Sequence, residues 1–421
     1  MFWNKPTVLM LGWEYPPHIN GGLGIACHGL ARALADDVNI TMIVPKSAAS
    51  DKSHLRIEGL DSYKEAVEEP IVSHFLETIP VNISLNPYSK INPETEVQFP
   101  AEFPALGKER ITDFATAELY GGDLYLKVKD YAHLVTQIAA QKSYQVIHAH
   151  DWMTFPAAIA LKKLTGKPLI IHIHSTEYDR MGAESKGWVY QMEKTAMEAA
   201  DAIITVSQYS ANILQKHYEI EGFKIFPVHN AILPAPIHKP KAKQFPEKLV
   251  TFLGRIAQQK NPVAFLEIAI KVMEQYDNVR FVMAGKGDLL SEMMEKVAQE
   301  KLGHKFHFTG FLETEAVNEL LSMTDIYVLP SISEPFGLSA LEAAQFGIPC
   351  VISRQAGVLE VLKGALTADY RDLDLMAEYI VTMLKFPELA AEVGKTSQES
   401  VADLTWAQSA AKVIEIYREY I

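Results

Sequence analysis

Cysteine is scarce in this chain: only Cys27 and Cys350 occur among 421 residues. They lie in opposite halves of the sequence, so we expect no disulfide framework of the kind that holds small secreted domains together. So little cysteine is typical of proteins from a reducing compartment, and we therefore expect a cytoplasmic protein.

Long apolar runs and positive charge are also missing. No run of about 18 apolar residues occurs, so we expect no transmembrane segment. The first six residues, MFWNKP, lead straight into a predicted strand, without the apolar region and cleavage site of a signal peptide. The net charge of −13 argues against nucleic acid as a partner. An anionic ligand must then be held by local lysines, arginines and helix ends.

What is present is an ordinary globular composition, with 48% hydrophobic and 22% charged residues. At 421 residues, two or three domains are expected. Apolar runs alternate with helical patterns throughout, which indicates parallel sheets flanked by helices. The predicted strands occupy residues 7–11, 40–44, 146–149, 169–174 and 202–206, and then 249–253, 280–284, 305–309, 326–329 and 349–352.

A linker divides this pattern into two series. Residues 233–246 are rich in proline and lysine and predict no central element, while residues 46–120 are irregular enough to predict insertions or a small subsheet. The predicted fold class is α/β, with two doubly wound, Rossmann-like domains at residues 1–235 and 245–400. The carboxyl ends of both sets of strands are expected to face a shared cleft.

Two glutamates, Glu334 and Glu342, frame the most informative stretch. Glu334 follows a predicted strand, and Glu342 lies about one turn inside a predicted helix, with the free backbone amides of Gly337, Leu338 and Ser339 between them. Helical rise separates the carboxylates by about 12 Å, more than the roughly 5–9.5 Å of a glycoside hydrolase pair. The pattern suits a ligand with terminal hydroxyls and central negative charge, such as a nucleotide sugar. The alternative is an ordinary loop carboxylate and helix glutamate.

Two cations follow the first strand of the second series. Arg255 and Lys260 lie at its carboxyl end, where ligands bind in such sheets. Together they can neutralise a diphosphate and the charge that it acquires on leaving. A basic, solvent-facing loop is the alternative.

Glycines follow several other strands. Gly21 and Gly22 allow a phosphate to approach the backbone before a predicted helix, although a structural turn is the alternative. A dinucleotide site is disfavoured because Cys27 takes the place of the last glycine of the GxGxxG pattern. Gly285 and the Gly310–Phe311 pair predict backbone that lines a nucleotide pocket, but simple strand-to-helix turns explain them almost as well.

Four histidines end two neighbouring strands of the first series. They are His148, His150, His172 and His174. We predict no metal site, since no HExxH geometry arises and cysteine ligands are absent. We expect His174 and Asp151 to bond sugar hydroxyls, and His148 and His172 to be hydrogen-bonded core residues. The Asp372–Asp374 pair resembles a metal-binding DxD motif, but helix capping explains it.

These motifs closely resemble the retaining glycosyltransferases of family 4, which have the GT-B architecture, and among them the glycogen synthase-like α-glucosyltransferases. The resemblance covers essentially the whole chain. It depends on WEYPP at residues 13–17 with Gly21 and Gly22, DAIITVS at 201–207, Gly254–Arg255 with Lys260, the Glu334–Glu342 segment, HDW at 150–152 and HSTE at 174–177 with Asp179–Arg180. One departure is that many bacterial glycogen synthases have a lysine just before the paired glycines, where residues 18–20 here read HIN.

The resemblance implies a role for each motif. Arg255 and Lys260 would bind the donor diphosphate, and Glu342 would bind the ribose. Glu334 and His174 would lie beside the transferred hexose. Residues 401–421 would cross back as a helix onto the first domain. No metal and no cofactor would be needed. The remaining implied contacts are donor binding by Gly21, Gly22, Gly285, Phe311, Phe336, Gly337, Leu338 and Ser339, and an acceptor side formed by Asp151, Trp152 and Glu14.

The predicted activity is transfer of glucose from ADP- or UDP-glucose to an α-1,4-glucan, with retention. Other family 4 hexosyltransferases remain an alternative. From other classes, a sugar-nucleotide epimerase shares the two-domain architecture, and a non-catalytic sugar-nucleotide sensor needs only the donor site. The sequence leaves the base, the hexose, the acceptor and the oligomeric state open.

Overall fold

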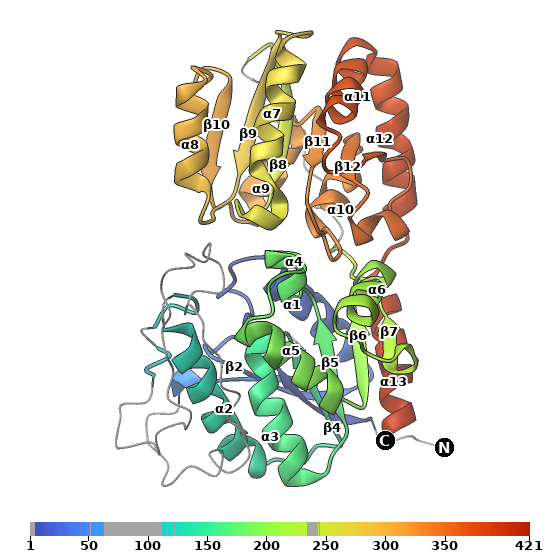
Figure 1. Cartoon of the computed structure of the whole chain (residues 1–421). Helices are drawn as coiled ribbons and strands as arrows, with labels where there is room; N and C mark the ends of the chain where they lie inside the picture. Colours follow the sequence, from blue (N-terminus) through green and yellow to red (C-terminus); the bar gives the residue numbers. More distant parts are fainter. Residues whose placement is uncertain are drawn as a thin grey trace. The chain divides into compact units, whose positions relative to one another are not determined.

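The computed structural model describes residues 5–50, 52–62, 112–115, 117–121, 123–233, 243 and 245–421. The chain divides into two compact units (Figure 1). Unit 1 comprises Met1–Val206, Ser210–Asn230 and Trp406–Ile421, and unit 2 comprises Ser207–Tyr209 and Ala231–Thr405. Much of the predicted irregular region at 46–120 and of the predicted linker at 233–246 falls outside the described residues.

Unit 1 is built on a seven-stranded parallel sheet in the order β3-β2-β1-β4-β5-β6-β7. Most of its strand residues are apolar and buried, as expected of strands covered on both faces. Their bounds are β1 Thr7–Leu11, β2 Asn39–Val44, β3 Leu55–Gly59, β4 Val146–His150, β5 Leu169–Ile173, β6 Ala202–Thr205 and β7 Ile225–Pro227.

The helices of unit 1 pack on this sheet in two groups. Helices α2, α3 and α5 pack beside one another, and α13, from the end of the chain, packs against α1 (Figure 1). Trp406 of α13 lies directly over Gly29 of α1, and Tyr417 of α13 reaches His148 of β4. The bounds are α1 Gly22–Leu34, α2 Leu124–Ala140, α3 Phe155–Thr165, α4 Glu177–Met181, α5 Trp188–Ala199, α6 Gln208–His217 and α13 Trp406–Tyr420.

Unit 2 has a six-stranded parallel sheet in the order β10-β9-β8-β11-β12-β13. The strands are β8 Lys248–Leu253, β9 Val279–Ala284, β10 Phe306–Gly310, β11 Ile326–Leu329, β12 Cys350–Ser353 and β13 Leu366–Ala368. The helices are α7 Pro262–Met273, α8 Leu290–Gln299, α9 Thr314–Met323, α10 Leu338–Gln345, α11 Leu373–Lys385 and α12 Pro387–Val401. The aromatic side chains of Phe252, Phe265, Phe281 and Phe306 pack together in its core.

The α/β class predicted from the sequence is confirmed, because both units are parallel sheets with helices between the strands. All ten predicted strands are present, with ends that differ by at most one residue. Strands β3, β7 and β13 were not predicted. Among the described residues, none of the helices is long and apolar enough to cross a bilayer.

The contact between α1 and α13 yields a stability prediction. A Cβ atom at Gly29 would lie 2.3 Å from the Trp406 ring, which is too close for any relaxed contact. Gly29→Ala should therefore lower the free energy of unfolding by about 1–3 kcal/mol through overpacking. The comparison is between urea-unfolding midpoints of the wild type and the variant. Gly303→Ala is the control, since nothing lies within 4 Å of its added Cβ. Equal midpoints for Gly29→Ala and the wild type would contradict the close packing of α13 on α1.

Candidate active site

A buried ion pair joins the carboxyl ends of two neighbouring strands in unit 2. Strands β8 and β11 pair in parallel, so the loops that follow them leave the same edge of the sheet. Lys260, in the 3-10 turn Gln258–Lys260 after β8, donates through Nζ to Oε2 of Glu334, in the loop after β11. The two side chains are only 17% and 6% exposed. Ser331 Oγ donates to the same carboxylate oxygen at 3.2 Å.

Backbone hydrogen bonds hold the loop around Glu334 in place. The Glu334 N–H donates to the Gln355 carbonyl at 2.8 Å, and the Gly357 N–H donates to the Glu334 carbonyl at 2.9 Å. The Gln259 side-chain amide donates to the Ser333 carbonyl at 3.0 Å. These hydrogen bonds join the loops after β8, β11 and β12. The position of Glu334 is therefore fixed by its backbone as well as by its side chain.

Helix α10 begins beside this pair. Gly337 precedes it with φ of 109°, a left-handed conformation that favours glycine, and a Cβ there would lie 3.2 Å from Cγ of Glu334. Among the described residues, no side chain caps this helix start. Its first amides, at Leu338 and Ser339, therefore suit an anion. Glu342 lies one turn further in and is partly buried, and burial raises its pKa to about 7.

Further loops of unit 2 come to the same sheet edge. Gly285, after β9, packs so tightly on Gly254 that a Cβ would lie 1.9 Å from the Gly254 carbonyl oxygen, and its own N–H donates to the Gly310 carbonyl at 2.9 Å. Arg255 is exposed in this row of loops, and Phe311 is 43% exposed. Phe336, by contrast, is buried. The predicted donor residues of unit 2 thus lie in loops at the carboxyl ends of the strands or, for Leu338, Ser339 and Glu342, in helix α10 that follows one of these loops.

Unit 1 has its own group of polar residues at the ends of β4 and β5. Asp151 follows β4 with φ of 58°, a strained conformation for a residue with a side chain. Its Oδ1 accepts a 2.7 Å hydrogen bond from the His174 N–H, and its own N–H donates to the His172 carbonyl at 3.0 Å. Burial raises the pKa of Asp151 to about 7, against the lowering effect of the His174 N–H and Arg180. Trp152, the next residue, is buried and edge-on to Trp188.

The four histidines lie together on one face of the sheet. His148 Nδ1 is 2.5 Å from the Tyr417 hydroxyl, and His150 Nδ1 is 3.0 Å from His174 Nε2. Burial lowers the pKa of His148 and of His174 to about 3, and that of His150 and His172 well below the usual value. All four are therefore neutral near pH 7.

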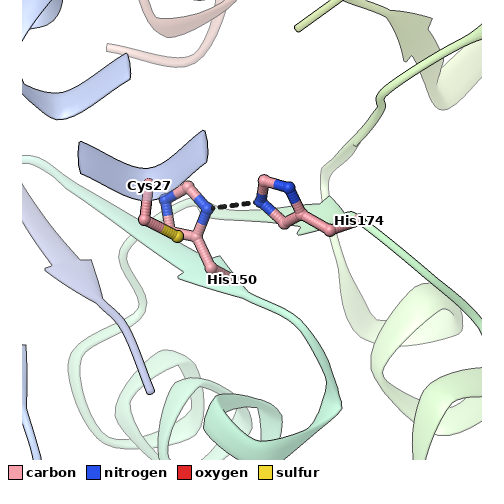
Figure 2. A group of neighbouring side chains, drawn as sticks. All are labelled: Cys27, His150 and His174. Carbon is pink, nitrogen blue, oxygen red and sulfur yellow. Dashed lines mark hydrogen bonds between the residues drawn. The ribbon is translucent and has the colours of Figure 1, made fainter. Parts of the chain in front are cut away.

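Two expectations about these histidines are wrong. His172 is buried as expected, but neither of its ring nitrogens has a partner among the described residues, so it is not a hydrogen-bonded core residue. Cysteine is not absent from their surroundings either. Cys27 of α1 lies beside His150 and His174, as Figure 2 shows, because α1 crosses above the strand ends. The capping role expected for Asp372 is confirmed, since its carboxylate accepts from the Leu375 N–H at the start of α11.

Glu14 and Gly21 lie before and at the start of α1. Glu14 is 1% exposed and accepts hydrogen bonds from the Asn20 N–H at 3.0 Å and from the Tyr120 hydroxyl. Gly21 is the residue before α1, and Gly22 is its exposed first residue. These residues order the loop that enters α1.

A buried carboxylate network that the sequence does not predict joins α4 to α5. Arg180 donates to Glu177 at 3.1 Å and to Glu193 at 2.6 Å, and burial raises the pKa of Glu193 to about 7. Thr176 and Asp179 cap α4 reciprocally. The sequence shows Glu177 and Arg180 beside His174, and Glu193 amid the buried face of α5, but the spacing does not reveal that they pair.

Two protein-family models together match most of this chain. The family model for the starch synthase catalytic domain matches residues 7–225, and the model for glycosyl transferases group 1 matches residues 235–400. An uncharacterized glycosyltransferase of Methanocaldococcus jannaschii is 27% identical over 372 residues, covering 85% of this chain and 82% of that protein. Glycogen synthase of Mycobacterium tuberculosis is 24% identical over 436 residues, covering 97% and 94%.

Two solved structures have the same fold. Sucrose-phosphate synthase of Thermosynechococcus elongatus superposes with a TM-score of 0.73 at 19% identity, covering 98% of each chain. The catalytic domain of starch synthase IV from Arabidopsis thaliana, bound to ADP and acarbose, superposes with a TM-score of 0.70 at 16% identity, covering 99% of each chain. The predicted GT-B fold is thereby confirmed.

The raised pKa of Asp151 yields a prediction about pH. A carboxyl whose folded pKa of about 7 exceeds its unfolded value of 3.8 stabilises the fold below pH 4, and this contribution is lost as the pH rises through 7. The buried histidines act in the opposite sense, since their stabilisation is lost as the pH falls below about 6.5. Asp151→Asn removes only the first effect, and asparagine tolerates positive φ.

The midpoint of thermal unfolding should therefore fall less, or rise more, between pH 5 and pH 8 in Asp151→Asn than in the wild type. Asp369→Asn is the control. The pKa of Asp369 is lowered by backbone and side-chain hydrogen bonds, so this group does not titrate in that range. If Asp151→Asn and the wild type responded identically to pH, the carboxyl would have an ordinary pKa.

Proposed function

Because this chain belongs to the glycosyltransferases with a starch synthase catalytic domain, we propose that it transfers glucose from ADP-glucose or UDP-glucose to the 4-hydroxyl of an α-1,4-glucan, with retention. Two findings support the substrate class. Glycogen synthase of M. tuberculosis aligns with 97% of this chain, and a structural relative holds ADP and acarbose. These relatives support a glucan acceptor and a nucleoside diphosphate donor, and the sequence leaves the base open.

The observation that carries the proposal is the Lys260–Glu334 pair beside the start of α10. A donor diphosphate gathers negative charge as its bond to the sugar breaks, and preorganised cations and amides stabilise that charge. Lys260 and Arg255 supply the cations. The backbone amides of residues 336–339 supply fixed dipoles for the phosphate and the sugar hydroxyls. Glu334, held by its ion pair and by Ser331, then lies near the hexose.

The other donor contacts follow the row of loops in unit 2. Glu342 binds the ribose hydroxyls, and its raised pKa leaves it able to donate as well as accept a hydrogen bond near pH 7. The tightly packed backbone at Gly285 and the exposed ring of Phe311 line the nucleotide pocket.

Unit 1 supplies the remaining groups. His174 contacts the hexose, and its bond to His150 fixes the orientation of its ring. Gly21 and Gly22 approach the phosphates at the start of α1. Asp151, Trp152 and Glu14 form the acceptor side, with the carboxylates as hydrogen-bond acceptors and Trp152 as a buried residue of its packing.

In this scheme, retention of the anomeric configuration requires no carboxylate nucleophile. The bond from the anomeric carbon to the phosphate oxygen breaks, and the acceptor oxygen forms its bond to that carbon on the same face. The acceptor proton passes to the departing diphosphate, so the leaving group itself serves as base. No metal ion and no cofactor enter this scheme. Exclusion of water keeps hydrolysis from competing with transfer.

The donor and acceptor are tested by incubating the chain with ADP-glucose and UDP-glucose, each with and without maltooligosaccharides, and measuring nucleotide release. We expect release that requires the glucan. An isomerised nucleotide sugar without acceptor would instead identify an epimerase, and binding without turnover would identify a sensor. Glucose 1-phosphate belongs among the acceptors, because α-maltose-1-phosphate synthase of Mycolicibacterium smegmatis is 29% identical over 307 residues, covering 65% of this chain and 79% of that protein.

Lys260→Ala tests the role of the cation. Loss of a comparable charge-stabilising donor costs about 3 kcal/mol in the transition state, so turnover should fall by about a hundredfold or more. Lys271→Ala is the matched control, since Lys271 pairs with Asp374 on the surface of unit 2. If Lys260→Ala had near-normal turnover and the same free energy of unfolding as the wild type, Lys260 would not stabilise the leaving group.

A further inference from the structure

Cys27, His150 and His174 bring three metal-binding side chains together from separate elements of unit 1. Cys27 comes from α1, His150 from the end of β4, and His174 from the residue after β5 (Figure 2). One ligand atom of each lies within 4.8 Å of the others. We propose that these three residues form a binding site for a zinc-type divalent ion, a ligand that the transfer chemistry described above does not use.

The geometry is close to that of a bound ion. Zinc bonds of about 2.0–2.3 Å in a tetrahedron place neighbouring ligand atoms about 3.3–3.7 Å apart. His150 Nδ1 and His174 Nε2 are already 3.0 Å apart. The Cys27 sulfur needs to approach by no more than about 1–1.5 Å, within reach of a side-chain rotation and a small shift of α1. Three protein ligands leave a fourth position open, as in catalytic zinc sites.

No hydrogen bond among the described residues fixes the proton on the outer ring nitrogens of His150 and His174. His150 is fully buried, and its Nε2 has no hydrogen-bond partner among the described residues. His174 Nδ1 is also buried without a partner there. A neutral imidazole has one lone pair and one N–H, so each ring can direct the lone pair of its inner nitrogen, His150 Nδ1 or His174 Nε2, toward an ion while its outer nitrogen carries the proton. Both rings are in that neutral form near pH 7.

The charges around the site favour a cation. Burial raises the pKa of the Cys27 thiol, and so does repulsion from the carboxylates of Asp151 and Glu14. The negative potential that disfavours a bare thiolate stabilises a divalent ion in the same place. Binding of the ion would therefore be coupled to release of the thiol proton.

The neighbouring group of His148, His150 and His172 is a weaker candidate. The rings of His148 and His172 are stacked with an interplanar angle of 5°, and that of His150 is tilted from them by 30° and 26°. Imidazole lone pairs lie in the ring plane, so stacked rings direct them side by side rather than toward one point. His174, unlike these three, is partly exposed and gives an ion a route to the site.

Metal binding would replace the hydrogen bond between His150 and His174. If His174 contacts the hexose as proposed above, the form of the protein without metal is the one that transfers sugar. This consequence rests on the proposed function, whereas metal binding itself does not, so the test below uses no activity measurement.

The experiment titrates Co²⁺, as a spectroscopic substitute for Zn²⁺, into the chelator-treated, dialysed full chain. We expect one equivalent to bind, with the intense thiolate-to-cobalt charge-transfer absorption and with displacement by Zn²⁺. Cys27→Ser should abolish that absorption and weaken binding by about tenfold or more. Cys350→Ser is the matched control, because Cys350 is the other buried free cysteine and lies in unit 2.

Each outcome of this titration either supports the metal site or overturns it. Absence of the charge-transfer absorption in the wild type at Co²⁺ concentrations up to millimolar would overturn the proposal. So would an equal absorption in Cys27→Ser, or its loss in Cys350→Ser. Should Cys27→Ser fail to fold, His174→Ala provides the second variant. It should retain the fold and bind Co²⁺ at least about tenfold more weakly, and unchanged affinity would equally overturn the proposal.

Discussion

The ion pair between Lys260 and Glu334 is the interaction on which the candidate site depends. A lysine and a glutamate this well buried are stable because each neutralises the other, and Ser331 adds a further hydrogen bond to the carboxylate. The pairing of β8 with β11 brings the two loops together, and the hydrogen bonds to the loop after β12 hold Glu334 in place. A positive charge is thus held beside a helix start, which is where we propose that the donor diphosphate binds.

Unit 1 also buries polar residues at the ends of its strands, but these are carboxyls and histidines rather than a lysine–glutamate pair. Polar residues gather where β4 and β5 end, and the sheet forces them into an apolar setting that raises carboxyl pKa values and lowers histidine pKa values. The positive φ of Asp151 persists because its backbone and side chain are both hydrogen-bonded to the neighbouring strand end. Strain of this kind is common at functional sites, which agrees with the role proposed for Asp151.

The sequence predicts most of the fold because buried parallel strands are continuous apolar runs that contrast with their helices. It fails for β3, which carries the charged residues Arg56 and Glu58, and for β7, which has only three residues and ends in Pro227. The loop positions of Glu334 and Lys260 were predictable from strand ends, but not their ion pair. The approach of Cys27 to His150 depends on how α1 crosses the sheet, which residue spacing along the chain does not encode.

The most direct test of the central claim is a calorimetric comparison of how tightly the wild type and Lys260→Ala bind ADP and adenosine, and likewise UDP and uridine. If Lys260 holds the diphosphate, the wild type binds the diphosphate far more tightly than the nucleoside, and this advantage shrinks by about tenfold or more in the variant. An advantage of the same size in both proteins would show that the diphosphate is held elsewhere and would contradict the account.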